Sequence, residues 1–138
     1  MSKSVPFVLT MDCERVNPGK PFYPAGPQTE RESARNITAF IDIARETGFP
    51  VTLFLTPEAA TLHADYLKGL DPEMVECGLH LHPRTFGLGV SESLGLLETA
   101  VQERLLAQAT GIIEEALGRR PVSFRAGSTP PTKPRSAF

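Results

Sequence analysis

Apolar residues follow two different spacings along the chain, and each spacing predicts a different kind of element. Four short runs are apolar at nearly every position, which is typical of buried strands. They cover residues 5–12, 49–56, 74–82 and 121–127. Three longer segments instead carry apolar residues three and four apart, the period of an amphipathic helix. These cover residues 29–47, 58–69 and about 92–117. The predicted order of elements is therefore β-α-β-α-β-α-β.

Residues suited to helix ends support these boundaries. Thr29 and Glu32 form a T-x-x-E capping box ahead of the first helical segment, and Gly48 supplies its stop. Thr56-Pro57 is a good cap and first-turn pair for the second helix. Gly118 ends the last helix in the same way as Gly48 ends the first.

Strands that are apolar throughout are buried on both faces, as in parallel sheets covered by helices. The sequence thus predicts an α/β protein, with a sheet that is either open or closed into a barrel. Right-handed crossovers would bring the carboxyl ends of all the strands to one rim. In both architectures that rim is where binding and catalytic residues gather.

Length and charge exclude several classes of function. The 138 residues fit one domain, and the net charge of −2 provides no basic field for nucleic acid or an anionic membrane surface. No apolar run approaches the roughly 20 residues of a membrane span. The first residues lack the apolar region of a signal peptide, and two cysteines cannot form a disulfide framework. We therefore expect a cytoplasmic protein with reduced thiols.

Polar residues able to carry chemistry follow three of the predicted strands. They are Asp12, Cys13 and Glu14 after the first strand, His80 and His82 at the end of the third, and Arg125 at the end of the fourth. Residues i and i+2 of a strand face the same side, so the two histidines could share one ligand. An acid, two imidazoles and a guanidinium on one rim favour a metal-dependent hydrolase site.

Each of these residues also has a purely structural interpretation. Asp12 could cap the turn that follows its strand, and Arg125 could form a surface ion pair. Cys13 and Cys77 are more often small buried hydrophobes than ligands. A single H-x-H pattern is weak evidence for a metal by itself. The third histidine, His63, has polar neighbours in a helix and is predicted to be solvated surface.

Four segments, taken in order, resemble the motifs of one enzyme family. They are "LTMDCE" (9–14), "FPVTLFLT" (49–56), "ECGLHLHP" (76–83) and "PVSFRAGS" (121–128). They resemble motifs of the polysaccharide deacetylases, the NodB-homology carbohydrate esterases. The resemblance implies an incomplete, distorted (β/α) barrel, with residues 1–128 as the N-terminal part of its catalytic domain. It also implies metal-dependent hydrolysis of an N-acetyl or O-acetyl group, with an acetylated saccharide as substrate.

Carried over to this sequence, the resemblance makes Asp12 the general base and His80 the first metal histidine. Arg125 would orient that base or bind near it. Two positions depart from the family pattern. The usual metal aspartate falls on Cys13, so Cys13 or Glu14 would replace it, and a thiolate is a fair zinc ligand. The usual second histidine falls on Arg84, so either His82 serves instead or the site has a single strong imidazole and His82 orients a neighbour. The expected cofactor is a divalent metal, with zinc as the first choice.

The resemblance stops at Ser128, and residues 129–138 are predicted to be an irregular Pro-rich tail. Family members continue well past the arginine strand. One hypothesis is a frameshift, because a nucleotide restored after Ser128 can give a continuation closer to the family pattern. Such a half barrel would have an uncovered sheet edge, which favours self-association, and it leaves open whether this chain alone is active.

Two other functions remain open from the sequence. The chain could be a non-catalytic carbohydrate-binding or interaction remnant of a deacetylase fold, as Cys13 and Arg84 at metal-ligand positions would suggest. It could also be another metal hydrolase on a (β/α) barrel, such as an amidohydrolase. Amidohydrolases place H-x-H at the first strand, whereas His80 and His82 lie at the third.

Overall fold

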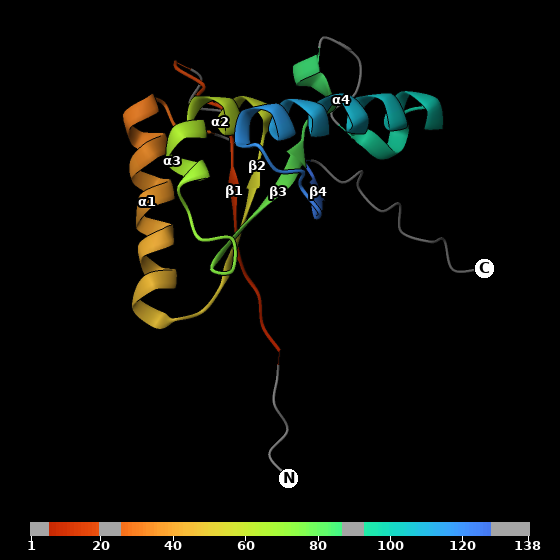
Figure 1. Ribbon diagram of the computed structural model, residues 1–138. Helices are drawn as coiled ribbons and strands as arrows, with labels where there is room; N and C mark the ends of the chain where they lie inside the picture. The colour runs from red at the N-terminus through yellow and green to blue at the C-terminus, as the bar shows by residue number, and fades with distance from the viewer. Residues whose placement is uncertain (1–5, 20–25, 87–92, 128–138) are drawn as a thin grey trace, which may run out of the picture.

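The computed structural model describes residues 6–19, 26–86 and 93–127, and these form an α/β unit around one curled sheet (Figure 1). The four strands are β1 (Leu9–Cys13), β2 (Val51–Leu55), β3 (Val75–Leu81) and β4 (Phe124–Ala126). All three strand pairings are parallel, and the strands lie side by side in chain order. The predicted α/β class with a parallel sheet is confirmed, and the shape is that of a partial barrel.

Helices connect these strands. They are α1 (Glu30–Thr47), α2 (Pro57–Leu62), α3 (Ala64–Lys68) and α4 (Thr99–Leu117), with 3-10 turns at Pro83–Phe86 and Leu94–Leu96. Because consecutive strands are neighbours and the crossovers share one hand, the connecting helices fall on the same face of the sheet. A doubly wound sheet would reverse its strand order at some point. The unbroken order from β1 to β4 therefore agrees with a barrel-like winding.

The predicted helix ends are present. The Thr29 side chain accepts a hydrogen bond from the Glu32 N–H at 3.1 Å, and Thr56 accepts one from the Ala59 N–H at 3.3 Å. Gly48 and Gly118 end their helices with φ values of 71° and 69°. That left-handed conformation is disfavoured for residues with a Cβ atom, which explains the glycine at both stops.

One face of the sheet packs against the helices and forms the core. Its buried strand residues are Cys13, Val51, Leu53, Leu55, Val75, Cys77, Leu79 and Leu81. Helix residues of the core include Ile37, Ile41 and Ala44 of α1, Ala59 and Ala60 of α2, Leu67 of α3, and Leu105, Ala109, Ile113 and Leu117 of α4. Since strand residues alternate between faces, the other face carries the intervening positions. On β1 and β3 these positions include Thr10, Asp12 and His80, so polar residues gather on the face opposite the core.

Several predicted boundaries were wrong. The helix expected over 58–69 is two short helices that meet at His63, whose backbone leaves helical geometry with φ −108° and ψ 17°. The long helix begins at Thr99, since Leu94 belongs to the preceding 3-10 turn, where it is buried. The start predicted near residue 92 lies outside the described residues.

The first and last strands are also shorter than predicted. β1 begins at Leu9, opposite Val51, the first residue of β2, and Phe7 and Val8 before it are exposed. β4 is reduced to three residues, and Val122 ahead of it is 86% exposed. Along the described ranges, no helix is both long enough and apolar enough to cross a membrane. The predicted tail, 129–138, lies outside the described residues.

Candidate metal centre

Three side chains from two strands meet at the carboxyl-end rim of the sheet. Glu14 directly follows β1, His80 lies near the end of β3, and His82 follows it. Glu14 Oε1 is 3.0 Å from His80 Nε2 and 2.9 Å from His82 Nε2, and the two Nε2 atoms are 3.1 Å apart. His80 is almost fully buried, whereas the side chains of His82 and Glu14 keep 23% and 24% exposure. The three atoms form a compact, partly open triangle.

The strands position these side chains by register. Cys13 pairs with Leu55, and Leu55 pairs with Leu79, so Glu14, one residue beyond β1, comes level with His80. His80 in turn pairs with Arg125 of β4. His80 Nδ1 lies 3.1 Å from the backbone carbonyl oxygen of Arg125. A carbonyl oxygen only accepts, so Nδ1 carries a hydrogen and donates it. The other ring nitrogen, Nε2, is thereby directed toward Glu14 and His82.

The pKa shifts of Glu14 and His80 show that a negative carboxylate and positive imidazoles stabilise one another in this triangle. Burial alone would raise the pKa of Glu14, but the hydrogen bonds and charges of His80 and His82 lower the pKa to about 2. Burial alone would lower the pKa of His80, but the hydrogen bond and charge of Glu14, with smaller help from Asp12, raise it overall. Three atoms that bear lone pairs cannot sit about 3 Å apart without a proton or a cation between them.

The residues fit a divalent metal ion by their chemistry and spacing. Two imidazole nitrogens and one carboxylate oxygen form a ligand set found in catalytic zinc sites, which leave a fourth position open. Zinc bonds of about 2.0–2.2 Å let one ion reach three atoms that lie about 3 Å apart. In the part of the chain that the structure describes, this trio is the group of acids, histidines and cysteines close enough to hold an ion.

Asp12 and Arg125 form a second pair beside the trio. Arg125 Nη1 donates to Asp12 Oδ1 at 2.6 Å, and Nη2 donates to Thr10 Oγ1 at 2.8 Å. The guanidinium carbon lies 4.2 Å from the centroid of the Phe54 ring, a cation–π contact. Both charged side chains of the pair are 38% exposed. The guanidinium is therefore fixed on three sides while Asp12 stays accessible to solvent.

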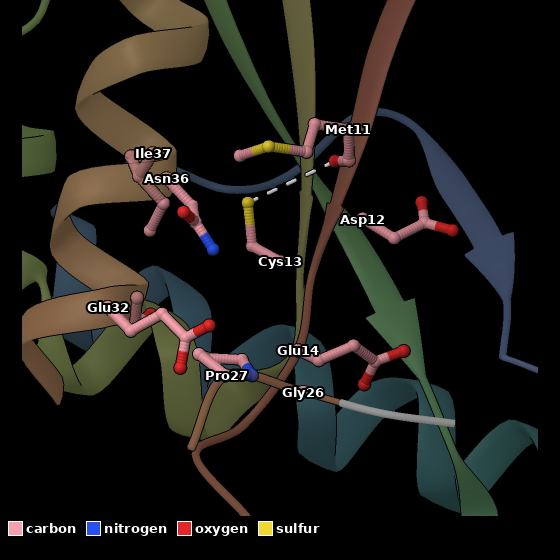
Figure 2. Close-up of a pocket in the computed structure, with 10 residues that line it drawn as sticks. Met11, Asp12, Cys13, Glu14, Gly26, Pro27, Glu32, Asn36 and Ile37 are labelled. Carbon is pink, nitrogen blue, oxygen red and sulfur yellow. Dashed lines mark hydrogen bonds between the residues drawn. The ribbon is translucent and has the colours of Figure 1, made fainter. Parts of the chain in front are cut away.

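Cys13 lies on the other face of β1. In Figure 2 its side chain projects toward α1, whereas Asp12 and Glu14 project to the opposite side of the strand. Its Sγ–H points at the Met11 carbonyl oxygen, 4.0 Å away, and it lines a pocket of about 190 Å³ with Asn36 and Ile37. Burial, and then the nearby Cys77, raises the pKa of the thiol. The structure thus brings Glu14, and not Cys13, together with the two histidines.

Two other sequence expectations concern Arg84 and His63. Arg84 is exposed in the 3-10 turn after β3, so the position four residues after His80 does not continue the strand. The prediction that His63 is solvated surface was wrong. Its Nε2 lies 2.8 Å from the hydroxyl oxygen of Ser33, a buried residue of α1, and burial lowers the pKa of His63 despite the charge of Glu30.

Sequence reasoning missed Thr10 and Phe54 as supports of Arg125. Strand alternation could have indicated Thr10, since it lies two residues before Asp12 on the same face. Phe54 resembles any other apolar strand residue, and only its register opposite Asp12 reveals its place beside the guanidinium.

Comparison with known proteins adds no assignment: no protein-family model matches the chain, and no curated protein matches it.

Proposed function

We propose that this chain is a metal-dependent hydrolase of the polysaccharide deacetylase type, which removes acetyl groups from N- or O-acetylated sugars. The observation that carries the proposal is the convergence of Glu14, His80 and His82 on the same rim as the Asp12–Arg125 pair. Three metal ligands, an accessible carboxylate and a fixed guanidinium are the components that hydrolysis of an amide or ester requires.

In this proposal Glu14, His80 and His82 hold the ion. A divalent ion bound there supplies Lewis acidity, which polarises an acetyl carbonyl and acidifies water. Glu14 contributes the negative charge of the ligand set. The hydrogen bond from His80 Nδ1 to the Arg125 carbonyl keeps the ring in the tautomer whose Nε2 can bind.

Asp12 acts as the general base and takes a proton from the attacking water. It lies two residues before Glu14, and the two side chains project to the same side of the chain. Its charge is near enough to help raise the pKa of His80. Arg125 is a positioning residue that acts through Asp12. Its hydrogen bond to Thr10 and its contact with Phe54 hold the guanidinium in place, so the carboxylate keeps one orientation.

The substrate class comes from the resemblance of the four strand-end motifs to the deacetylase family. Supporting features are the polar residues on the sheet face opposite the core and the partial exposure of His82, Glu14 and Asp12. A saccharide presents hydroxyl groups that can donate to such acids. Both N-acetyl and O-acetyl groups carry the carbonyl that the site would polarise.

The test is acetate release by the purified full chain, loaded with one equivalent of zinc, from a panel of N- and O-acetylated saccharides. We expect release with the parent chain, loss of at least about 100-fold in Asp12→Asn, and unchanged zinc content in that variant. Asp65→Asn, on the exposed side of α3, is the matched control and should retain activity. Saccharide binding with no acetate from any substrate would refute the hydrolase and favour the non-catalytic binding module.

A further inference from the structure

We propose that Gly127 is a positioning residue for His82: the space left by its missing side chain is where the His82 ring must lie to face Glu14 and His80. This inference rests on the proposed metal centre and adds to it a residue outside the ligand set. It concerns the end of β4, a segment far from the histidines in sequence.

The first observation is steric. A Cβ atom built on Gly127 would lie 2.5 Å from each of three atoms of the His82 ring, Cγ, Cδ2 and Cε1. Since these atoms lie around the ring, the added carbon would stand over its face. The Gly127 N–H also donates to the Leu81 carbonyl oxygen at 2.9 Å, so the glycine is tied to the residue just before His82. Backbone and ring are therefore in direct contact.

The size of the steric overlap determines how far the His82 ring would have to move. Carbon atoms in contact prefer separations of about 3.5–4.0 Å, so the ring would have to move by about 1 Å to admit a methyl group. Ligand geometry must be held to within about 0.5 Å for a site to work. A displacement of this size takes His82 Nε2 out of the triangle in which it lies 2.9 Å from Glu14 and 3.1 Å from His80.

Gly127 is not required by its backbone conformation. Among the described glycines, positive φ occurs at Gly19, Gly48 and Gly118, so Gly127 is outside the left-handed region that favours glycine. Substitution by alanine thus tests contact with the His82 ring without backbone strain.

The same strand end also supports the other histidine. Arg125 pairs with His80 across β3 and β4, and its carbonyl oxygen accepts the hydrogen of His80 Nδ1. Residues 125–127 therefore position both imidazole rings. Arg125 holds the His80 ring by a hydrogen bond, and Gly127 leaves room for the His82 ring because it has no side chain. Supporting contacts of this kind are commonly worth 10–100-fold in metal affinity.

The experiment measures zinc affinity by calorimetric titration of the full chain and of four variants. In Gly127→Ala we expect affinity to fall by about 10–100-fold. Gly111→Ala is the matched control, because a Cβ there meets nothing within 4 Å, and its affinity should equal that of the parent. The third and fourth variants are His82→Ala and His82→Ala/Gly127→Ala. Their affinities should equal each other, since the ring that the methyl would displace is gone.

Three results would overturn the inference: equal affinity in Gly127→Ala and the parent, a further loss in the double variant relative to His82→Ala, or unfolding of metal-free Gly127→Ala. Thermal unfolding of each metal-free variant supplies the last comparison. Failure of the parent chain to bind zinc is a separate outcome that removes the metal centre itself. In that case the imidazole NMR signals of His82 in the metal-free protein decide the steric claim, and unchanged signals in Gly127→Ala would overturn it.

Discussion

Replacement of Glu14 by glutamine in the metal-free chain should remove a stabilising interaction whose size depends on pH. The two histidines lower the pKa of Glu14 from 4.5 to about 2, against the effect of burial. A group with a lowered pKa in the folded state stabilises the fold above its unfolded pKa and loses that contribution as pH falls toward the folded value. For Glu14 the loss runs between about pH 4.5 and pH 2.

The magnitude follows from these two pKa values. At pH 5.5 the ionised carboxylate contributes about 3 kcal/mol to the free energy of unfolding, and at pH 3 roughly half as much. His80 adds no slope in this range, because its raised pKa gives a contribution that is fully present below about pH 6.5 and is lost only at higher pH. Glu14→Gln should therefore destabilise the chain more at pH 5.5 than at pH 3, by about 2 kcal/mol.

Urea denaturation followed by circular dichroism, on protein stripped of metal, measures the difference directly. Glu103→Gln removes the same charge from an exposed position on α4 and should change stability by less than about 0.5 kcal/mol at both pH values. A destabilisation by Glu14→Gln that is equal at pH 5.5 and pH 3 would refute the reasoning. It would mean that the carboxylate does not receive charge-assisted hydrogen bonds from the histidines in the folded chain.

Three further outcomes are expected. Arg125→Ala should reduce acetate release by about 100-fold or more. It should destabilise the fold by only about 1–2 kcal/mol, because the ion pair between Arg125 and Asp12 is partly exposed. Retained activity in a folded variant would contradict the role of Arg125. His63→Gln should cost more stability at pH 7.5 than at pH 5.5 in denaturation experiments. Burial lowers the pKa of His63, so the contribution of the neutral ring to the free energy of unfolding is complete above about pH 6.5 and is lost as pH falls below it. A loss of stability that does not depend on pH would argue against that burial. Leu53→Ala, at a fully buried position of β2, should lower the free energy of unfolding by about 2–5 kcal/mol, and a cost below about 1 kcal/mol would contradict the packing of the core.

The arrangement of strands and helices was predictable because it depends on local signals. Runs of apolar residues fixed the positions of β2 and β3, and Gly48 and Gly118 marked helix ends through a backbone conformation that other residues avoid. The break at His63 was not predictable from its neighbours. It coincides with a hydrogen bond to Ser33, thirty residues away, which depends on how α1 packs beside α2.

The candidate site was only partly predictable for the same reason. Parallel strands with their carboxyl ends on one rim predicted that Asp12, Glu14, His80 and Arg125 would lie near one another. The sequence left Cys13 and Glu14 as alternatives, because the face of β1 that turns toward the helices depends on packing with α1. The contact between Gly127 and the His82 ring depends on the register of β4 on β3. A strand of only three residues carries too short a sequence pattern to predict that register.

Zinc stoichiometry tests the central claim most directly. The metal-free chain is equilibrated with excess zinc at pH 7.5, passed through a desalting column and assayed for bound metal by mass spectrometry. We expect one zinc ion per chain in the parent and in His63→Gln, which alters the histidine outside the trio, and loss of that ion in His80→Ala. Equal zinc content in the parent and His80→Ala, or none in either, would contradict the existence of a metal centre at Glu14, His80 and His82.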